Sequence, residues 1–224
     1  MIVLSVDIGG SSVKAVRSDD PERRSLPSGS DYTPEQFRDD LPRLSGGKPF
    51  GAVTIGFPAP VRRGRILIEP VNLGKGWTGF DLASGLGVPC RVVNDAVMQA
   101  IGSYRGDRML FLGLGTGLGV ALIDDYRPIG LELARLPYRK GEYEDSLGAR
   151  GLERLGERKW RKRVLEVTEL FQAAFVADSV VLGGGNARLL EGEELPRGVE
   201  LGDNRKAFLG GFRLWDREWA SATA

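Results

Sequence analysis

One pattern occurs twice in the chain and limits the folds that it can adopt. Residues 2–20 (IVLSVDIGGSSVKAVRSDD) and 108–125 (RMLFLGLGTGLGVALIDD) each hold an apolar strand, a glycine-rich turn and an alternating strand that ends in two aspartates. A glycine turn between two such strands predicts a β-hairpin. The recurrence indicates an internal repeat and hence two related domains, divided near Gly106.

Strands and helices alternate after each hairpin. Thr33 is placed to cap a helix over 33–44, with Pro34 at its first position. Buried strands are expected at 50–58 and 90–94, a short helix at 79–87, and a surface loop over the polar residues 18–33.

The second half repeats this alternation. Residues 149–175 predict a charged helix, and residues 178–190 predict a strand followed by a glycine cluster and a helix. Residues 204–215 predict a final helix broken near Gly210-Gly211. An alternation of strands and helices is typical of α/β architecture. We therefore predict an N-terminal domain over 1–105 and a C-terminal domain over 106–224, with the last helix able to pack back on the N-terminal domain.

Composition excludes several kinds of chemistry. The 224 residues are 42% hydrophobic with a formal net charge of +1, which favours a soluble globular protein and gives no sign of a nucleic-acid partner. No membrane span or signal peptide is apparent, so a cytoplasmic location is expected. Cys90 is the single cysteine, so no internal disulfide can form. Histidine is absent, so acid-base chemistry near neutral pH falls to Asp, Glu, Lys, Tyr or water.

Three glycine clusters follow apolar strands: DIGGSSVK from Asp7, GLGTGLG from Gly113, and LGGGNA from Leu182. Backbone amides in such turns suit phosphate oxygens. Any one cluster alone is explained as well by a hairpin turn or a helix cap. Neither the dinucleotide-binding G-x-G-x-x-G before a helix nor the P-loop motif occurs, so those two kinds of site are excluded.

The Asn94-Asp95 pair lies between an apolar strand and a helical segment. Either side chain can cap the helix, and Asp95 can instead accept a proton from a substrate. Both readings hold together if Asn94 caps the helix and Asp95 faces the substrate.

The motifs VDIGGSSVK, VVNDA, LGLGTGLG, ELARLP and VVLGGGNA occur in the order found in the ROK family of sugar kinases, repressors and open reading frames. The chain resembles this family from Val6 to about Trp215. It is most similar to zinc-free glucokinases and polyphosphate glucokinases, which have phrases like VNLGKGW and LPYRKG. The resemblance implies an α/β, two-domain actin-like fold, shared with hexokinase and the Hsp70 ATPase, with a cleft between the domains. It also implies a homodimer.

The resemblance assigns phosphate and nucleotide binding to the glycine clusters. Asp7 would hold Mg²⁺, through water, as a hard oxygen ligand. The residues that would contact the phosphoryl donor are Gly9, Gly10, Ser11, Lys14, Gly115, Thr116, Gly117, Gly183, Gly184 and Gly185. Lys14 can equally face solvent from its alternating strand, and Asn186 can be a simple helix cap.

The resemblance also assigns the sugar site. Its residues would be Asn72, Asn94, Asp95, Glu132, Arg135 and Glu144. Asp95 would take the proton from the attacking sugar hydroxyl. The expected reaction moves a phosphoryl group from ATP or polyphosphate to a hexose hydroxyl, with the 6-hydroxyl of glucose as the first choice. Basic runs at 62–65 and 158–163 would suit polyphosphate, although solvated surface explains them more simply.

Two departures from the family leave alternatives open. The chain has no His and Cys cluster after Glu132, so no zinc is expected. Arg135 occupies the position of a histidine that donates to sugar hydroxyls and supports the glutamate, and this arginine could pair with Glu132 instead. The alternatives are therefore a kinase for a different sugar, or a sugar- or nucleotide-binding homologue without turnover. Because the first strand begins at Ile2, without the helix-turn-helix of ROK repressors before it, a DNA-binding repressor is not expected.

Overall fold

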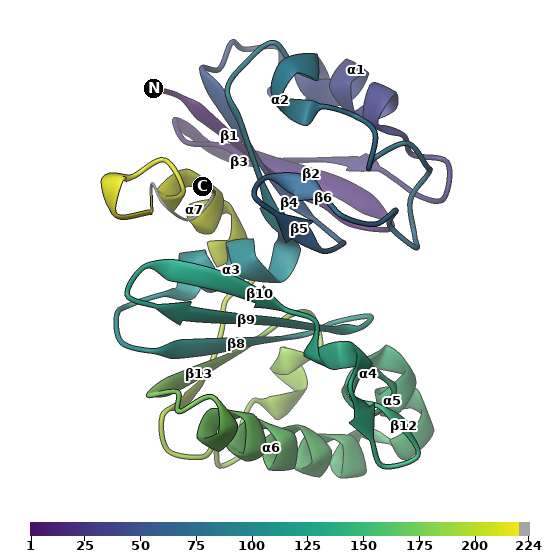
Figure 1. Ribbon diagram of the computed structural model, residues 1–224, viewed down its shortest axis with the longest axis vertical. Helices are drawn as coiled ribbons and strands as arrows, with labels where there is room; N and C mark the ends of the chain where they lie inside the picture. The colour runs from purple at the N-terminus through teal and green to yellow at the C-terminus, as the bar shows by residue number, and fades with distance from the viewer. Residues whose placement is uncertain (220–224) are drawn as a thin grey trace. The chain divides into compact units, whose positions relative to one another are not determined.

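Two units, each built on its own five-stranded sheet, make up the computed structural model, which describes residues 1–219 (Figure 1). The first unit comprises Met1–Gly102 and the described residues from Ala207 onward. The second unit comprises Ser103–Lys206. Each unit has its own hydrophobic core.

The sheet of the first unit has the order β3-β2-β1-β4-β7. Its strands are β1 (Val3–Ile8), β2 (Ser12–Arg17), β3 (Asp20–Pro27), β4 (Ala52–Phe57) and β7 (Cys90–Asn94). The first three strands form an antiparallel meander, whereas β4 and β7 run parallel to β1. The carboxyl ends of β1, β4 and β7 therefore lie at one edge of the sheet.

The second unit repeats this topology with the order β10-β9-β8-β13-β14. Its strands are β8 (Met109–Leu114), β9 (Leu118–Asp124), β10 (Arg127–Leu131), β13 (Ser179–Gly183) and β14 (Val199–Leu201). Again three antiparallel strands are followed by two that run parallel to the first. The internal repeat that the sequence indicates is confirmed in the order and direction of all five strands.

Helices and short hairpins complete each unit (Figure 1). The first unit contains α1 (Pro34–Leu44), the hairpin β5–β6 (Val61–Arg62 and Arg65–Ile66), α2 (Leu82–Gly85), α3 (Asp95–Ser103, whose last residue falls in the second unit), α7 (Lys206–Arg213, whose first residue does likewise) and the 3₁₀ helix η3 (Arg217–Trp219). The second unit contains η1 (Leu133–Arg135), the hairpin β11–β12 (Pro137–Tyr138 and Gly141–Glu142), α4 (Glu144–Leu147), α5 (Ala149–Leu155), α6 (Glu157–Ala174) and η2 (Ala187–Leu190).

Helix α1 begins as its sequence predicts. The Thr33 hydroxyl accepts a hydrogen bond from the Gln36 N–H, and the Gln36 side chain accepts one from the Thr33 N–H, which together form a capping box. Phe37 lies on the buried face of α1, beside the fully buried Trp77. The cap therefore fixes the start of a helix whose apolar face enters the core of the first unit.

The surface loop expected at 18–33 is wrong in part, because residues 20–27 form β3. This strand pairs antiparallel with β2, from Ser12 opposite Pro27 to Arg17 opposite Asp20. Strand β3 lies at the sheet edge, where only one side needs backbone partners and polar side chains can face water. Its polar composition therefore concealed an edge strand.

The break expected near Gly210-Gly211 is also wrong, because α7 is continuous through both glycines. A Cβ atom at Gly210 would collide with the Met98 carbonyl of α3, and one at Gly211 would collide with the Ser5 hydroxyl of β1. The glycines allow α7 to approach α3 and the sheet closely. The Thr54 hydroxyl of β4 also donates to the Gly211 carbonyl at 2.7 Å and ties α7 to the sheet.

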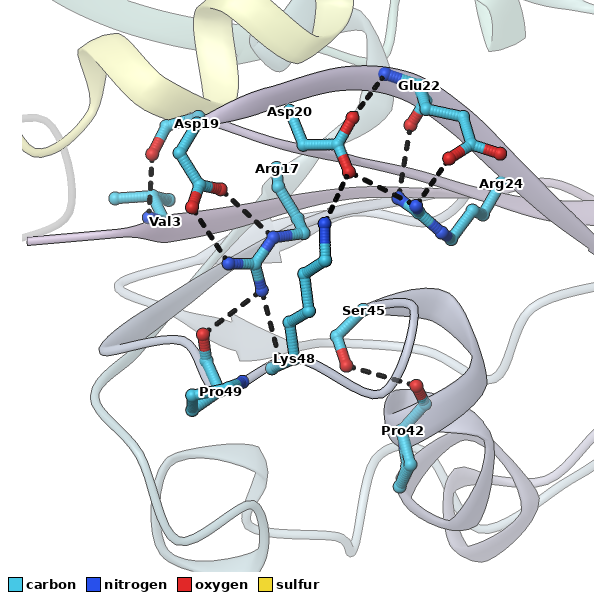
Figure 2. Close-up of polar contacts among 11 residues, drawn as sticks. Val3, Arg17, Asp19, Asp20, Glu22, Arg24, Pro42, Ser45, Lys48 and Pro49 are labelled. Atoms are coloured by element: carbon cyan, nitrogen blue, oxygen red, sulfur yellow. Dashed lines mark hydrogen bonds and ion pairs between the residues drawn. The ribbon is translucent and has the colours of Figure 1, made fainter.

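A buried arginine fastens the β2–β3 hairpin to the segment before β4 (Figure 2). Only 3% of Arg17 is exposed. Its guanidinium donates two hydrogen bonds to the Asp19 carboxylate, at 2.9 and 3.0 Å, and two to the Lys48 and Pro49 carbonyls, at 3.1 and 3.0 Å. This fork of donors joins the hairpin to two backbone carbonyls of the segment before β4.

We expect Gly210→Ala to lower the free energy of unfolding by about 3 kcal/mol, because its methyl group meets backbone atoms that cannot move aside cheaply. Urea unfolding followed by circular dichroism measures the change. Leu209→Ala, at an exposed position of the same helix, is the control and should change stability much less. Equal stability of Gly210→Ala and the parent would contradict the close packing of α7.

We expect Arg17→Ala to lower the free energy of unfolding by about 2 kcal/mol, because two carbonyls lose their donor. Arg23→Ala, at an exposed position of β3, should leave the thermal unfolding midpoint nearly unchanged. If both variants unfold at the parent temperature, Arg17 does not fasten the hairpin.

Candidate active site

Several predicted site residues of the first unit lie at the edge of the sheet formed by the carboxyl ends of β1, β4 and β7. The first glycine turn follows β1, and Asn94 and Asp95 lie where β7 passes into α3. A Cβ atom at Gly10 would lie 2.7 Å from the Cβ of Asn72, so the glycine turn and Asn72 are in contact. Ligands of open α/β sheets bind at this kind of edge.

The first glycine turn is held by residues on both sides. The Gly9 N–H donates to the Ser12 carbonyl at 3.0 Å, and the Ser28 hydroxyl donates to the Gly9 carbonyl at 2.6 Å. Sequence reasoning missed Ser28, because it lies in the segment that was expected to be a loop. Only the pairing of β2 with β3 brings it to the turn.

Asp7 and Lys14 face each other across the β1–β2 hairpin. Burial raises the pKa of the Asp7 carboxyl, and the charge of Lys14 partly offsets this shift. Lys14 is half-buried and electrostatically coupled to Asp7, so it does not simply project into solvent. One carboxylate beside a glycine turn suits Mg²⁺, which binds proteins through one or two carboxylates and takes its other oxygens from water and phosphate.

Asn72 is presented by a firmly anchored loop. Glu69 accepts hydrogen bonds from the Trp77 and Thr78 N–H groups at 3.2 and 3.1 Å. The Trp77 indole is buried against Phe57, with ring centroids 4.9 Å apart, and donates to the Tyr32 carbonyl at 3.2 Å. The exposed Asn72 is thus attached to the core of the first unit through Trp77.

Asn94 caps α3, as one of the two sequence readings expected. Its side-chain oxygen accepts from the Ala96 and Val97 N–H groups at 3.0 and 3.4 Å, and its amide nitrogen donates to the Ala59 carbonyl at 3.3 Å. Asp95 occupies the first turn, where its carboxylate accepts from the Ala96 N–H at 2.8 Å. Asp95 therefore has a fixed position at the helix N-terminus, where the helix dipole favours an ionised carboxylate.

In the second unit, parallel pairing of β8 and β13 brings two glycine turns together. The Asn186 side chain donates to the Gly115 carbonyl at 3.1 Å, and a Cβ atom at Gly184 would collide with the Leu114 carbonyl. The Gly184 N–H donates to the Asn204 side chain at 3.0 Å, a contact that sequence reasoning missed. Asn204 follows β14 and joins the cluster only through the sheet topology.

The helix expected after the glycine cluster is present at Ala187–Leu190, as a four-residue 3₁₀ helix, η2. It stops where Glu191 becomes extended, before Gly192 at φ 83°. Asn186 makes no side-chain capping bond to η2, because its amide connects the two glycine turns instead.

Three acidic residues surround Arg135. The arginine contacts Glu142 at 3.4 Å and Glu144 at 3.7 Å. Glu132 is exposed as a residue, but burial of its carboxyl group raises the pKa of that group. The positive charge of Arg135 offsets part of this shift, and the negative charge of Glu144 adds to it. Arg135 forms its direct ion pairs with Glu142 and Glu144, and acts on Glu132 through its charge.

Glu144 also touches the second glycine turn. A Cβ atom at Gly117 would collide with the Glu144 carboxylate, and the Ala149 N–H donates to the Thr116 carbonyl at 3.1 Å. The start of α4 and the turn at 115–117 therefore form one contact surface. Within residues 1–219 we find no group of three or more His, Cys, Asp or Glu able to hold a metal ion. No helix in that part of the chain has the length and apolar character to cross a membrane.

The chain is similar to known proteins in sequence, over part of its length. No family model matches it. The N-acetylmannosamine kinase of Citrobacter koseri is 35% identical over 143 residues, which cover 57% of this chain and 49% of that protein. The N-acetylmannosamine kinase of Escherichia coli O157:H7 is 34% identical over 139 residues, which cover 55% and 47%. The chain thus spans about half the length of the curated relatives that it matches.

Solved structures resemble nearly the whole chain. The polyphosphate/ATP-glucomannokinase of Arthrobacter sp. strain KM has a TM-score of 0.78 at 22% identity, covering 93% of this chain and 96% of that one. A ROK family glucokinase of Streptomyces griseus, solved with glucose and AMPPNP, has a TM-score of 0.71 at 19% identity, covering 94% and 97%. These similarities confirm the expected α/β, two-domain actin-like fold.

We expect any neutral ligand whose hydroxyl groups donate to Glu132 to bind more weakly as the pH falls through the raised pKa of Glu132. An ionised carboxylate accepts hydrogen bonds that its protonated form cannot, so protonation removes binding, and the acid limb should lie above the ordinary glutamate value of 4.5. A pH profile of the dissociation constant of a monosaccharide ligand measures this limb. Glu132→Gln should abolish it, and a limb of unchanged position in that variant would exclude Glu132 as its source.

Proposed function

We propose that this chain is a sugar kinase of the ROK family, which transfers a phosphoryl group from ATP to a hydroxyl of a hexose or a hexose derivative. The observation that carries the proposal is Asp95, a carboxylate fixed at the N-terminus of α3 on the sheet edge that also bears the first glycine turn. The fold similarity and the partial sequence match to sugar kinases support it.

Asp95 is the proposed general base. A carboxylate is a weak base, so its contribution depends on its orientation toward the attacking hydroxyl, whose proton leaves late as the phosphoryl group transfers. Asn94 supports this role by capping α3 and so fixing the first turn that carries Asp95. Asn72, Asn94, Glu132 and Glu144 are the proposed partners of the sugar hydroxyls.

The glycine turns are the proposed donor site. The residues at 9–11 and 115–117 would bind phosphate oxygens through backbone amides. Lys14 would add positive charge next to Asp7. Mg²⁺, placed through water by Asp7, would neutralise the charge on the donor phosphates. The segment 183–185 would contact the rest of a nucleotide; since the Gly184 N–H already donates to Asn204, this contact would use other atoms of the turn.

The acceptor is proposed as a hexose phosphorylated at its primary hydroxyl. Glucose follows from the sequence resemblance, and N-acetylmannosamine follows from the relatives at 34–35% identity. Arg135 bears on the choice, because it supplies a fixed positive charge among Glu132, Glu142 and Glu144. Polyphosphate is a second proposed donor, since the exposed arginines of the β5–β6 hairpin (Arg62, Arg63 and Arg65) offer a basic surface.

We expect Asp95→Asn to lower kcat for sugar phosphorylation by about 10²- to 10⁴-fold, as general-base catalysis contributes, with sugar binding retained. A coupled assay should compare glucose, mannose and N-acetylmannosamine, each with ATP and with polyphosphate. Asp216→Asn, an exposed carboxylate after α7, is the control and should keep the parent kcat. Near-parent turnover by Asp95→Asn would remove Asp95 from the mechanism, whereas no turnover by the parent with any pair would overturn the proposed kinase.

A further inference from the structure

The segment from Glu132 to Glu144 contains both proposed sugar-binding glutamates of the second unit. Glu132 lies directly before η1, and Glu144 is the first residue of α4. Between them runs the β11–β12 hairpin, which pairs Tyr138 with Gly141. The Tyr143 N–H donates to the Leu136 carbonyl at 3.2 Å and closes the segment into a loop. Whatever holds this hairpin therefore also limits where the two carboxylates lie.

Stacked side chains anchor the hairpin to α6. The Tyr138 ring stacks on Tyr143, with centroids 4.4 Å apart and planes at 15°. Tyr143 in turn packs on Phe171 of α6, at 4.8 Å. The guanidinium carbons of Arg139 and Arg163 lie 5.5 and 5.7 Å from the Tyr138 ring centroid, within the range of a cation–π contact.

A single carboxylate of α6 receives the polar groups of this hairpin. Glu166 accepts from the Tyr138 hydroxyl at 3.1 Å and from the Arg139 guanidinium at 2.8 and 3.2 Å. Burial acts to raise the pKa of Glu166, but the hydrogen bonds from Arg139 and Tyr138 outweigh it and hold the pKa below its usual range. Glu166 is therefore an ionised acceptor at neutral pH, with two donors from one hairpin.

The backbone of the hairpin turn is in a conformation that is uncommon for arginine. Arg139 has a φ of 57°, in the left-handed region that glycine and asparagine usually occupy. An arginine there is strained, but its Nη2 donates to both oxygens of the Glu166 carboxylate, a contact that a glycine could not make. The turn thus keeps an unfavourable backbone residue whose side chain ties it to α6.

We propose that Tyr138, Arg139 and Glu166 are positioning residues, which fix the separation of Glu132 and Glu144 and thereby set the affinity for the sugar. The two carboxylates repel each other, as the effect of Glu144 on the pKa of Glu132 indicates, so a loose hairpin would let them move apart. Arg135, paired with Glu142 of the hairpin and with Glu144, opposes the repulsion only while the hairpin stays in place. The inference rests on the proposed function for its substrate.

Two measurements on the full chain test this proposal. Tyr138→Ala should raise the KM for the sugar about tenfold, as expected for loss of a stacked ring with its cation contacts, and leave kcat at saturating sugar and the KM for ATP nearly unchanged. Tyr138→Phe keeps the stacked ring and should restore most of the affinity. Glu166→Gln should raise the sugar KM by an intermediate factor, because it weakens the hydrogen bonds from both Arg139 and the Tyr138 hydroxyl.

Hydrogen exchange of the peptide spanning 132–144 provides a readout that does not need activity. In Tyr138→Ala and Glu166→Gln this peptide should exchange faster than in the parent, while the peptides of β8 and β9 stay protected. The control is Tyr126→Ala, which removes an exposed tyrosine of the same unit. Tyr126 directly precedes β10, whereas Glu132 directly follows it. It should change neither the exchange of 132–144 nor the sugar KM.

The outcomes separate the positioning role of Tyr138, Arg139 and Glu166 from the proposed kinase function. An unchanged exchange rate and an unchanged sugar KM in Tyr138→Ala would overturn the positioning role. Equal losses in kcat, ATP affinity and thermal midpoint would also overturn it, because they would indicate general destabilisation. If the parent phosphorylates no sugar, the proposed kinase function fails, and the exchange of 132–144 still decides whether the cluster holds the hairpin.

Discussion

Parallel pairing of strands that are far apart in sequence is the constraint on which the rest of the structure depends. In each unit, two later strands add beside the first strand of an antiparallel meander. This arrangement places the residues that follow β1 and β7 at one edge of one sheet, and those that follow β8, β13 and β14 at one edge of the other. The polar and glycine residues that such edges need come from separate segments, so neither edge can exist before its sheet is complete.

Glycine serves two different purposes in this chain, and the difference matters for function. Gly10 and Gly117 lie in turns at the edges of the two sheets. A Cβ atom added at Gly10 would meet Asn72, and one added at Gly117 would meet Glu144; both are proposed sugar ligands. Gly210 and Gly211 instead let one helix approach another helix and the sheet beneath it. The first pair links the proposed donor site to the proposed acceptor site within each unit, and the second pair contributes only to packing.

Charged groups near the proposed sugar residues are arranged in shared networks. Arg135 lies among three glutamates, and Glu166 collects donors from the hairpin that separates two of them. Because Arg135 and Glu166 each have more than one partner, a change at one residue alters the position or the pKa of others. The affinity for the acceptor is therefore expected to depend on residues of α6 that need not contact it.

The sequence by itself determined the duplicated hairpins, the capped helix α1, the glycine turns and the Asn-Asp pair at the start of α3, because each depends on neighbouring residues with strong local preferences. It failed for β3, whose polar side chains suit a loop or an edge strand equally well, and for Gly210-Gly211, whose close contacts are with segments distant in sequence. Only the tertiary structure decided that Ser28 holds the first glycine turn, that Asn186 and Asn204 join the second unit's turns, and that Arg135 pairs with Glu142 and Glu144. Most of these contacts join residues that strand pairing or the β11–β12 hairpin brings together, and hydrophobic periodicity and turn chemistry carry no information about which distant partner a side chain will meet.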